Sequence, residues 1–307
     1  MLLSVVIPMY NEKEVIAETY RRLTGVLVPV GVDYELIFVN DGSADGTFDV
    51  LMAAAGEDRH VKIIDFARNF GHQMAVRAGL AKSSGDAVVI IDADLQDPPE
   101  IIPGMMDKWR EGYDVVYGQR VSREGETFFK KFTAFAFYRV LRALSGVDIP
   151  ADTGDFRLID RKVVEAILAM NEHGTFLRGM VSWVGFRQCP YPFKRAERFA
   201  GETKYPLKKM LKLAMDGIFS FSTAPIRFLL LGGLGMGLFG FLYWLLTLIF
   251  SWGSTHVLLS ALFIFTGLLF CGMFVLGEYI GRTYEETMNR PLYLIARTVG
   301  FDDERIR

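Results

Sequence analysis

The residues best suited to chemistry lie in the stretch VVIIDADLQDPP, from Val88 to Pro99. Its apolar, β-branched start fits a strand buried on both faces, and the polarity then reverses. In extended backbone, Asp92, Asp94 and Gln96 would share one side. Two carboxylates at the end of a buried strand repel each other unless a cation joins them, and oxygen ligands suit Mg²⁺ or Mn²⁺. The pattern predicts a metal site formed by these three residues; a solvated loop or a pair of helix caps is the alternative.

The first 120 or so residues alternate between short apolar runs and amphipathic segments. Segments near 12–28, 45–57, 72–83 and 99–111 have helical length and spacing. The strand candidates between them are Ser4–Pro8, Glu35–Asn40, Val61–Phe66, Ala87–Ile91 and Val115–Tyr117. This alternation predicts an α/β, Rossmann-like domain with a mostly parallel sheet, whose ligands gather at the carboxyl ends of the strands.

Each of these strands is followed by a polar cluster. The clusters are Tyr10-Asn11-Glu12, Asp41-Gly42-Ser43, Arg68-Asn69, Asp92-Ala93-Asp94 and Gly118-Gln119-Arg120. A turn would explain one or two of them, but five at one sheet edge are hard to explain by sheet stability alone. They predict a shared nucleotide site.

Composition narrows the class of protein. The chain has 307 residues, a net charge of −2 and 51% hydrophobic residues, which argues against general nucleic-acid binding. Cys189 and Cys271 lie far apart and form neither a metal pair nor a convincing disulfide. The N-terminus lacks a basic region and a long apolar core, so it reads as a strand rather than a signal peptide.

The apolar excess is concentrated near the C-terminus. No Lys, Arg, Asp or Glu occurs between Arg227 and Glu278, and Phe228–Phe250 and Val257–Gly277 are each long enough to cross a hydrocarbon core of about 30 Å. They predict a hairpin of two transmembrane helices over residues 226–281, with a buried soluble hairpin as the alternative. The flanks carry Lys and Arg and the connecting loop carries none, which predicts a multi-pass protein of the cell (inner) membrane with both termini in the cytoplasm.

Two basic, aromatic segments precede this region, at about 125–145 and at 204–225. Basic faces opposite Phe and Leu are typical of helices in the membrane interface, although ordinary domain helices with a wet face would look the same. The domains expected are therefore a cytoplasmic catalytic domain over 1–203, a juxtamembrane helix over 204–225, the hairpin, and a cytoplasmic tail over 282–307, whose end from Arg297 to Arg307 is expected to be charged and solvated.

Several motifs together resemble a known family. They are VVIPMYNE, VNDGS, ARNFGHQMA, DADLQDPPE, GDFRL and GETKY, the last followed by the two spans. The set resembles family 2, GT-A fold glycosyltransferases that act on polyprenyl phosphate. It is most similar to bactoprenol (undecaprenyl-phosphate) glucosyltransferases of the GtrB type, which are related to dolichol-phosphate mannose synthase.

The resemblance implies roles for individual residues. It places the nucleotide near Pro8, Tyr10, Glu12, Asp41, Ser43, Asn69, Asp92 and Asp94. It places Mg²⁺ or Mn²⁺ and the diphosphate at Asp92, Asp94 and Gln96, and gives catalytic importance to Asp94, Arg120 and Asp155. The basic residues that would meet the acceptor phosphate and the diphosphate are Arg120, Arg123, Lys131, Arg198 and Lys204. Asp155 is either a general base or a residue that orients Arg157 or another basic neighbour.

The implied activity is transfer of one sugar, glucose first, from a UDP-sugar to undecaprenyl phosphate, with inversion to a β-linked product. Another hexose, an N-acetylhexosamine or mannose from GDP-mannose are alternatives. Polymerisation is disfavoured because the Gln-x-x-Arg-Trp motif of processive synthases is missing. The competing class is an inactive GT-A membrane scaffold or flippase partner. The resemblance also implies a homotetramer and a possible flippase partner for the enzyme itself.

Overall fold

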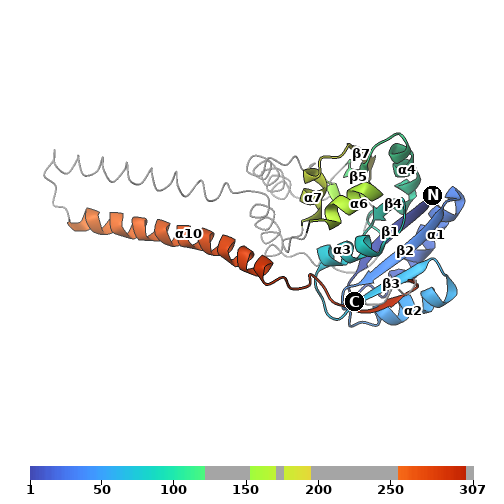
Figure 1. Cartoon of the computed structure of the whole chain (residues 1–307), viewed down its shortest axis with the longest axis horizontal. Coiled ribbons are helices and arrows are strands. Elements are labelled where there is room, and N and C mark those ends of the chain that lie inside the picture. Colours follow the sequence, from blue (N-terminus) through green and yellow to red (C-terminus); the bar gives the residue numbers. More distant parts are fainter. Residues whose placement is uncertain (122–152, 171–175, 195–254, 302–307) are drawn as a thin grey trace.

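The computed structural model describes residues 1–121, 153–170, 176–194 and 255–301 (Figure 1). The elements in chain order are β1 (Leu2–Met9), α1 (Ile16–Val30), β2 (Asp33–Asn40), α2 (Thr47–Glu57), β3 (Val61–Phe66), α3 (His72–Lys82), β4 (Ala87–Ile90), η1 (Pro99–Ile101), α4 (Ile102–Arg110), β5 (Val115–Arg120), β6 (Thr153–Asp160), α6 (Arg161–Leu168), α7 (Leu177–Trp183), β7 (Gln188–Phe193), α10 (Thr255–Thr287) and β8 (Ile295–Val299).

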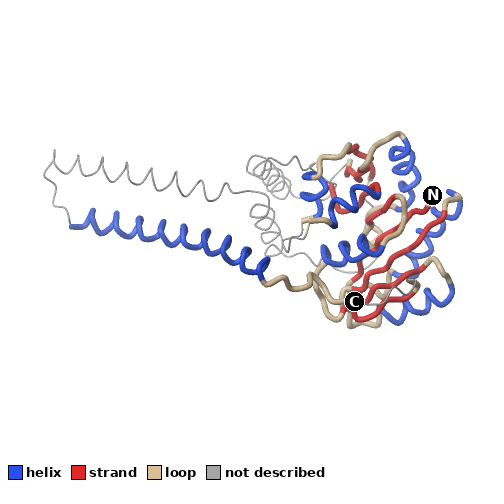
Figure 2. Tube along the Cα trace, in the orientation of Figure 1, coloured by secondary structure: helices blue, strands red, loops and turns tan. Residues whose placement is uncertain are grey.

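Within these ranges the strands form one sheet of eight strands, in the order β7-β5-β6-β4-β1-β2-β3-β8 (Figure 2). Strands β4, β1, β2 and β3 are parallel neighbours, whereas β6 and β8 run antiparallel to the strands beside them. Because β5 and β7 run in the same direction as β4, six of the eight strands are parallel to one another: the sheet is mostly parallel, as the sequence predicted, and is mixed through β6 and β8. Because β6 runs the other way, its first residues lie at the edge where β4 and β5 end. That reversal brings Asp155 to the carboxyl edge of the parallel strands.

The sheet is the middle of three layers. Successive strand residues point to opposite faces, so Val5 and Ile7 join one buried cluster and Val6 joins the other. Buried side chains of α1, α2 and α4 belong to the first cluster, and those of α3, α6 and α7 belong to the second. Both faces of the sheet are covered, which explains why its central strands read as continuous apolar runs.

The first half of the fold agrees with the sequence analysis. The strands β1 to β5 and the helices α1 to α4 fall at the predicted segments, and Pro99 opens η1, which leads directly into α4. The sequence analysis assigned no elements to β6, α6, α7 and β7. It also expected a solvated end from Arg297 to Arg307, and the structure corrects the start of that segment, because Ile295–Val299 forms an edge strand that pairs with β3.

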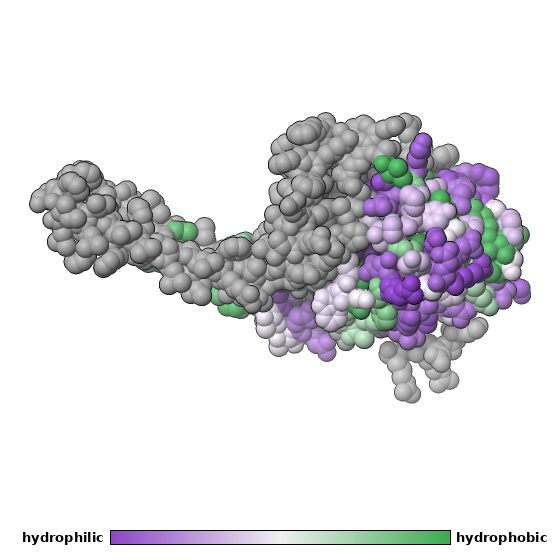
Figure 3. Space-filling view, turned by 90° about the horizontal axis from the view of Figure 1, so that it is seen from above, coloured by the Kyte–Doolittle hydropathy of each residue, from purple (hydrophilic) through white to green (hydrophobic). Residues whose placement is uncertain are grey.

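The helix α10 extends away from the sheet domain (Figure 1). Among the residues that the structure describes, no helix is both long and apolar enough to cross a membrane. The expected span 257–277 falls inside α10, whereas the expected span 228–250 and the two amphipathic segments lie outside the described residues. In Figure 3 the visible surface of the sheet domain is largely hydrophilic, with smaller hydrophobic patches.

Candidate active site

The loops after β1 and β2 are joined by hydrogen bonds at the carboxyl edge of the sheet. The backbone N–H of Asn11 donates to Oγ of Ser43 at 2.8 Å, and Oδ1 of Asn11 accepts from the backbone N–H of Ala44 at 2.9 Å. The backbone N–H of Glu12 donates to Oγ1 of Thr47 at 3.1 Å. Asn11 adopts a positive φ of 53°, a conformation that Asn tolerates better than most residues. These contacts fix the loop after β1, which carries Tyr10 and Glu12, against the loop after β2, which carries Ser43.

Asp41 joins this loop pair to the loop before α3. Its two carboxylate oxygens accept the backbone N–H groups of Phe70 at 2.6 Å and Gly71 at 2.9 Å, and Nδ2 of Asn69 donates to its backbone carbonyl at 3.2 Å. Burial raises the pKa of the Asp41 carboxyl above its ordinary value, although the two N–H groups oppose the change. Asp41 therefore orders the predicted nucleotide site; its contact with a nucleotide stays a prediction.

Gly42 allows the loop after β2 to approach the loop between β3 and α3 closely. Its φ is +64°, and a Cβ there would lie 2.4 Å from the backbone carbonyl carbon of Arg68 and 2.5 Å from the backbone nitrogen of Asn69. Neither atom belongs to a side chain that could move aside. Any other residue would separate the loops that the sequence predicts to hold the nucleotide.

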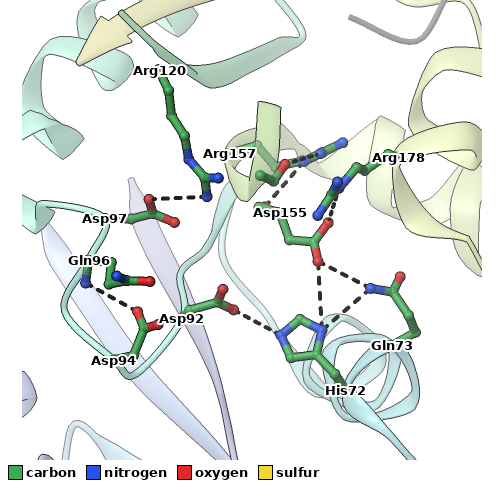
Figure 4. A network of polar contacts seen from close by, with 11 residues as sticks. His72, Gln73, Asp92, Asp94, Gln96, Asp97, Arg120, Asp155, Arg157 and Arg178 are labelled. Carbon is green, nitrogen blue, oxygen red and sulfur yellow. Dashed lines mark hydrogen bonds and ion pairs between the residues drawn. The ribbon is translucent and has the colours of Figure 1, made fainter. Parts of the chain in front are cut away.

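The loop after β4 carries the predicted metal ligands. Figure 4 shows Asp92, Asp94 and Gln96 along this loop, with the carboxylate of Asp92 turned toward His72. The backbone N–H of Gln96 donates to Oδ1 of Asp94 at 3.1 Å, and Leu95 between them has a positive φ of 58°. The metal ion at these side chains stays a prediction.

The donor set fits an open site for a hard divalent cation. Within the described part of the chain, no three or more His, Cys, Asp or Glu side chains are grouped to enclose a metal ion. Mg²⁺ is commonly held by one or two carboxylates, with water and substrate phosphates completing its shell. The carboxylates of Asp92 and Asp94 and the amide oxygen of Gln96 are ligands of that kind.

His72, the first residue of α3, connects this loop to β6. Its Nε2 lies 2.8 Å from Oδ1 of Asp92, and its Nδ1 lies 3.7 Å from Oδ2 of Asp155 (Figure 4). Burial by itself lowers the pKa of the imidazole, but the carboxylates of Asp92 and Asp155 outweigh it and raise the pKa of His72 to about 9. A protonated His72 thus lies between the two carboxylates at neutral pH.

Asp155 is buried, and its carboxylate is surrounded by donors. Nε of Arg178 donates to its Oδ1 at 2.8 Å, and Nε2 of Gln73 donates to its Oδ2 at 3.2 Å. Gln73 in turn accepts the backbone N–H of Leu177 at 3.0 Å, which ties the start of α7 to α3. Burial alone raises the pKa of the Asp155 carboxyl, but Arg178 and His72 outweigh it and hold that pKa well below the ordinary aspartate range.

Two further arginines lie near this cluster. Arg157 is buried and donates to the backbone carbonyls of Asp155 at 3.2 Å and Gly154 at 2.8 Å. The carboxylate of Asp155 therefore holds Arg178 by a direct ion pair, whereas Arg157 donates to the backbone carbonyl of Asp155. Arg120, at the end of β5, has its Nη2 3.8 Å from Oδ1 of the buried Asp97.

The structure brings most of the predicted site residues to one sheet edge. Around the described loops these are Pro8, Tyr10, Glu12, Asp41, Ser43, Asn69, Asp92, Asp94, Gln96, Arg120 and Asp155. Arg123, Lys131, Arg198 and Lys204 lie outside the described residues. The sequence analysis gave no role to His72, Gln73, Asp97 or Arg178. His72 and Gln73 lie in the motif ARNFGHQMA and Asp97 lies in DADLQDPPE, so the position of these motifs directly after a strand could have indicated a role for them. No motif of the sequence analysis contains Arg178.

Comparison with known proteins assigns the family. Residues 4–168 match the family model of glycosyl transferase family 2. The chain is 50% identical over 312 residues to the uncharacterized glycosyltransferase YkcC of Bacillus subtilis, covering 99% of this chain and 96% of that protein. It is 41% identical over 304 residues to the prophage bactoprenol glucosyl transferase homolog of Escherichia coli K12, covering 97% and 99%. The chain belongs to glycosyl transferase family 2, with a GT-A-like mixed α/β sheet, and its resemblance to bactoprenol glucosyltransferases is confirmed.

Solved structures give weaker matches. Glucosyl-3-phosphoglycerate synthase from Mycobacterium tuberculosis, crystallised with Mn²⁺, UDP-glucose and phosphoglyceric acid, matches with a TM-score of 0.48 and 22% identity, covering 71% of this chain and 79% of that one. TarS of Staphylococcus aureus matches with a TM-score of 0.44 and 16% identity, covering 62% and 58%.

Proposed function

We propose that this chain transfers a single sugar from a UDP-sugar, glucose first, to a polyprenyl phosphate, with a divalent metal ion at Asp92, Asp94 and Gln96. The observation that carries the proposal is that the predicted nucleotide loops and the predicted metal loop lie at one sheet edge. The loops after β1, β2 and β3 are joined to one another by hydrogen bonds, and the loop of Asp92 is connected through His72 to Asp155. The acceptor is inferred from the bactoprenol glucosyl transferases of Escherichia coli and Shigella phage SfV, which are each 41% identical to this chain.

The reaction proposed is one displacement at the sugar. A phosphate oxygen of the acceptor attacks the anomeric carbon while the bond from that carbon to the diphosphate breaks, so the configuration inverts. Bound Mg²⁺ or Mn²⁺ would neutralise the negative charge that develops on the leaving diphosphate. Asp92, Asp94 and Gln96 would hold that cation and, through it, the phosphate end of the donor, and the loops around Asn11 and Asp41 would fix its nucleoside end.

The acceptor itself decides the role of Asp155. A phosphate monoester has a second pKa of about 6, so the attacking oxygen is already largely ionised near pH 7. It needs positioning and charge neutralisation, which Arg supplies well. Asp155 already accepts donors from Arg178 and Gln73, so we assign it to holding these cationic and polar side chains in place rather than to removing a proton.

The place of the reaction is proposed as the cytoplasmic surface of the cell membrane, with segment 226–281 as the anchor. The uncharged run between Arg227 and Glu278 supports this placement. Apolar side chains at least half exposed also lie along α10: Leu258, Leu262, Phe265, Leu269, Met273 and Ile280. Labelling of single introduced cysteines in intact cells tests the orientation, and labelling of a residue in the sheet domain from outside would contradict it. A homotetramer and a flippase partner stay predictions.

Transfer from a panel of UDP- and GDP-sugars to undecaprenyl phosphate tests the activity, with purified full-length protein in detergent. We expect one UDP-sugar to be used in the presence of Mg²⁺ or Mn²⁺, and the Asp94→Ala variant to be inactive. If the wild-type chain transfers no sugar, the inactive scaffold is the better description. The anomeric configuration of the lipid-linked product is then read by NMR; a β-linkage is expected, and an α-linkage would overturn the single displacement.

A further inference from the structure

The segment after α10 returns to the sheet domain and pairs with β3, whose side chains contact residues that hold loop 41–43 of the predicted nucleotide site. Strand β8 pairs antiparallel with β3, from Ile63 opposite Val299 to Phe66 opposite Ile295, and the backbone N–H of Ala67 donates to the carbonyl of Leu294 at 3.0 Å. In Figure 1 this strand lies beside β3, at the opposite end of the sheet from β7. The family match ends at residue 168, so this strand is not part of the matched region.

A chain of polar contacts leads from β8 to the loop after β2. Arg297 donates to Oδ2 of Asp65 from Nε at 2.9 Å and lies within 2.8 Å of it through Nη2. Oδ1 of the same buried carboxylate accepts Nδ2 of Asn40 at 2.7 Å. Oδ1 of Asn40 then accepts the backbone N–H of Ser43 at 3.3 Å. The guanidinium of Arg297 also stacks on the ring of Phe48, 3.7 Å from its centroid.

A second chain of contacts, through aromatic rings, reaches the same loop. The ring of Tyr293 stacks on Phe66 with centroids 5.1 Å apart, and Phe66 meets Phe70 edge to face at 5.6 Å. The backbone N–H of Phe70 is the donor to Oδ1 of Asp41. The two chains are independent of each other, and they end at Ser43 and Asp41, two residues apart.

From this double connection we infer that β8 is a positioning element of the donor-nucleotide site, with Arg297 as its principal contact. The inference rests on the proposed function, because it assigns loop 41–43 to the nucleotide. A strand that only sealed the sheet edge would need backbone pairing alone. Here the side chain of Arg297 orients the carboxylate of Asp65, which holds the amide of Asn40. That amide accepts the backbone N–H of Ser43. The segment that follows α10 therefore helps to complete the site, and Arg297 acts through Asp65 and Asn40 rather than by touching the donor.

The test compares Arg297→Met with Lys162→Met in the full-length protein. Lys162 is a matched control, since its Nζ pairs with Oδ1 of Asp114 at 2.6 Å and its side chain is 55% exposed, against 60% for Arg297. It also lies over an aromatic ring, that of Phe186. Arg297→Lys serves as the conservative variant, which keeps the charge and loses the two-nitrogen contact.

We expect Arg297→Met to weaken UDP binding and raise the KM for the donor by about fivefold, within the range of measured couplings between sites, with kcat little changed. Arg297→Lys should restore part of the affinity, and Lys162→Met should match the wild type. Equal UDP affinities and donor KM values for Arg297→Met and Lys162→Met would overturn the inference.

Hydrogen exchange separates this inference from the proposed function. Backbone amides of loop 41–46 should exchange faster in Arg297→Met than in Lys162→Met, whether or not the protein transfers a sugar. Unchanged exchange in this loop would overturn the positioning role. If the wild-type chain bound no UDP, the proposed function would fail, and the exchange rates would still decide whether β8 orders the loop.

Discussion

Nε of Arg178 donates to Oδ1 of Asp155 at 2.8 Å, and this ion pair joins the first turn of α7 to the start of β6. The other oxygen of Asp155 faces Gln73 at 3.2 Å and His72 at 3.7 Å. A carboxylate held this way, with its pKa well below the ordinary range, is a poor acceptor for a further proton. The geometry therefore favours the second of the two roles that the sequence analysis left open, orientation of a basic neighbour, and identifies that neighbour as Arg178.

Removal of either partner of this ion pair should have similar effects on catalysis. We expect Asp155→Asn and Arg178→Met each to lower kcat about 10- to 100-fold, the cost typical of residues that orient a charged site. The double variant should be little worse than either single one, because residues that act as a unit are not additive. Steady-state transfer assays measure this directly. A severe loss in Asp155→Asn beside a mild loss in Arg178→Met, together with a lost acidic limb in the pH–rate profile, would restore the general-base role.

The same ion pair predicts how stability depends on pH. The pKa of Asp155 is lower in the folded protein than in the unfolded chain, so its contribution is present above the ordinary aspartate pKa of about 3.9 and is lost as the pH falls through the lower folded value. Asp155→Asn should reduce the free energy of unfolding by about 2–3 kcal/mol near pH 7, discounted because Arg178 is partly exposed. The difference from the wild type should shrink at acidic pH.

Urea unfolding of the full chain in detergent, at neutral and acidic pH, measures this difference. Asp107→Asn is the control, because Asp107 forms only an exposed pair with Arg110 on α4. A stability difference between wild type and Asp155→Asn that stays constant with pH would contradict the predicted ion pair.

Gly42→Ala should damage the predicted nucleotide site through the backbone. The φ of +64° and the contacts of 2.4 and 2.5 Å to the backbone of Arg68 and Asn69 leave no room for a methyl group. We expect a loss of about 2–4 kcal/mol in the free energy of unfolding, together with weaker UDP binding. Gly56→Ala in α2 is the matched control, since no atom lies within 4 Å of the added Cβ, and helix propensity should make it neutral or stabilising by up to about 1 kcal/mol. If both variants bind UDP like the wild type, the loops do not need this close approach.

Local patterns account for the parts of the fold that could be predicted. The strands β1 to β5 are short apolar runs, and the helices between them keep one buried face, so their positions follow from a few neighbouring residues. The polar ends of parallel strands meet at one edge for topological reasons, which is why Asp41 and Asp92 could be assigned to one site. The metal ligands were assigned from the alternation of Asp92, Asp94 and Gln96 directly after an apolar strand.

Distant pairings account for the rest. The stretch GDFRL of β6 contains the buried Asp155, and its burial is acceptable because Arg178 of α7 and Gln73 of α3 supply donors to its carboxylate. The stretch IARTV of β8 has a charged residue at its centre and reads as a polar tail. It becomes a strand because it pairs with β3, and Arg297 finds its partner Asp65 232 residues earlier in the chain. No local spacing encodes such a contact.

The metal site gives the last prediction. Asp94→Asn should remove Mn²⁺-dependent UDP binding and reduce transfer by at least about 100-fold, because it removes one of two carboxylates available to the cation, whose attraction is large in a partly buried site. Asp107→Asn makes the same change of charge on the exposed face of α4, so binding and transfer should be unchanged in that variant. Titration of Mn²⁺ by electron paramagnetic resonance, with and without UDP, measures the binding. If the wild type bound UDP equally well after chelation by EDTA, and Asp94→Asn transferred sugar normally, the loop after β4 would hold the donor without a metal ion, and His72, whose pKa the neighbouring carboxylates raise, would be one of the positive charges beside it.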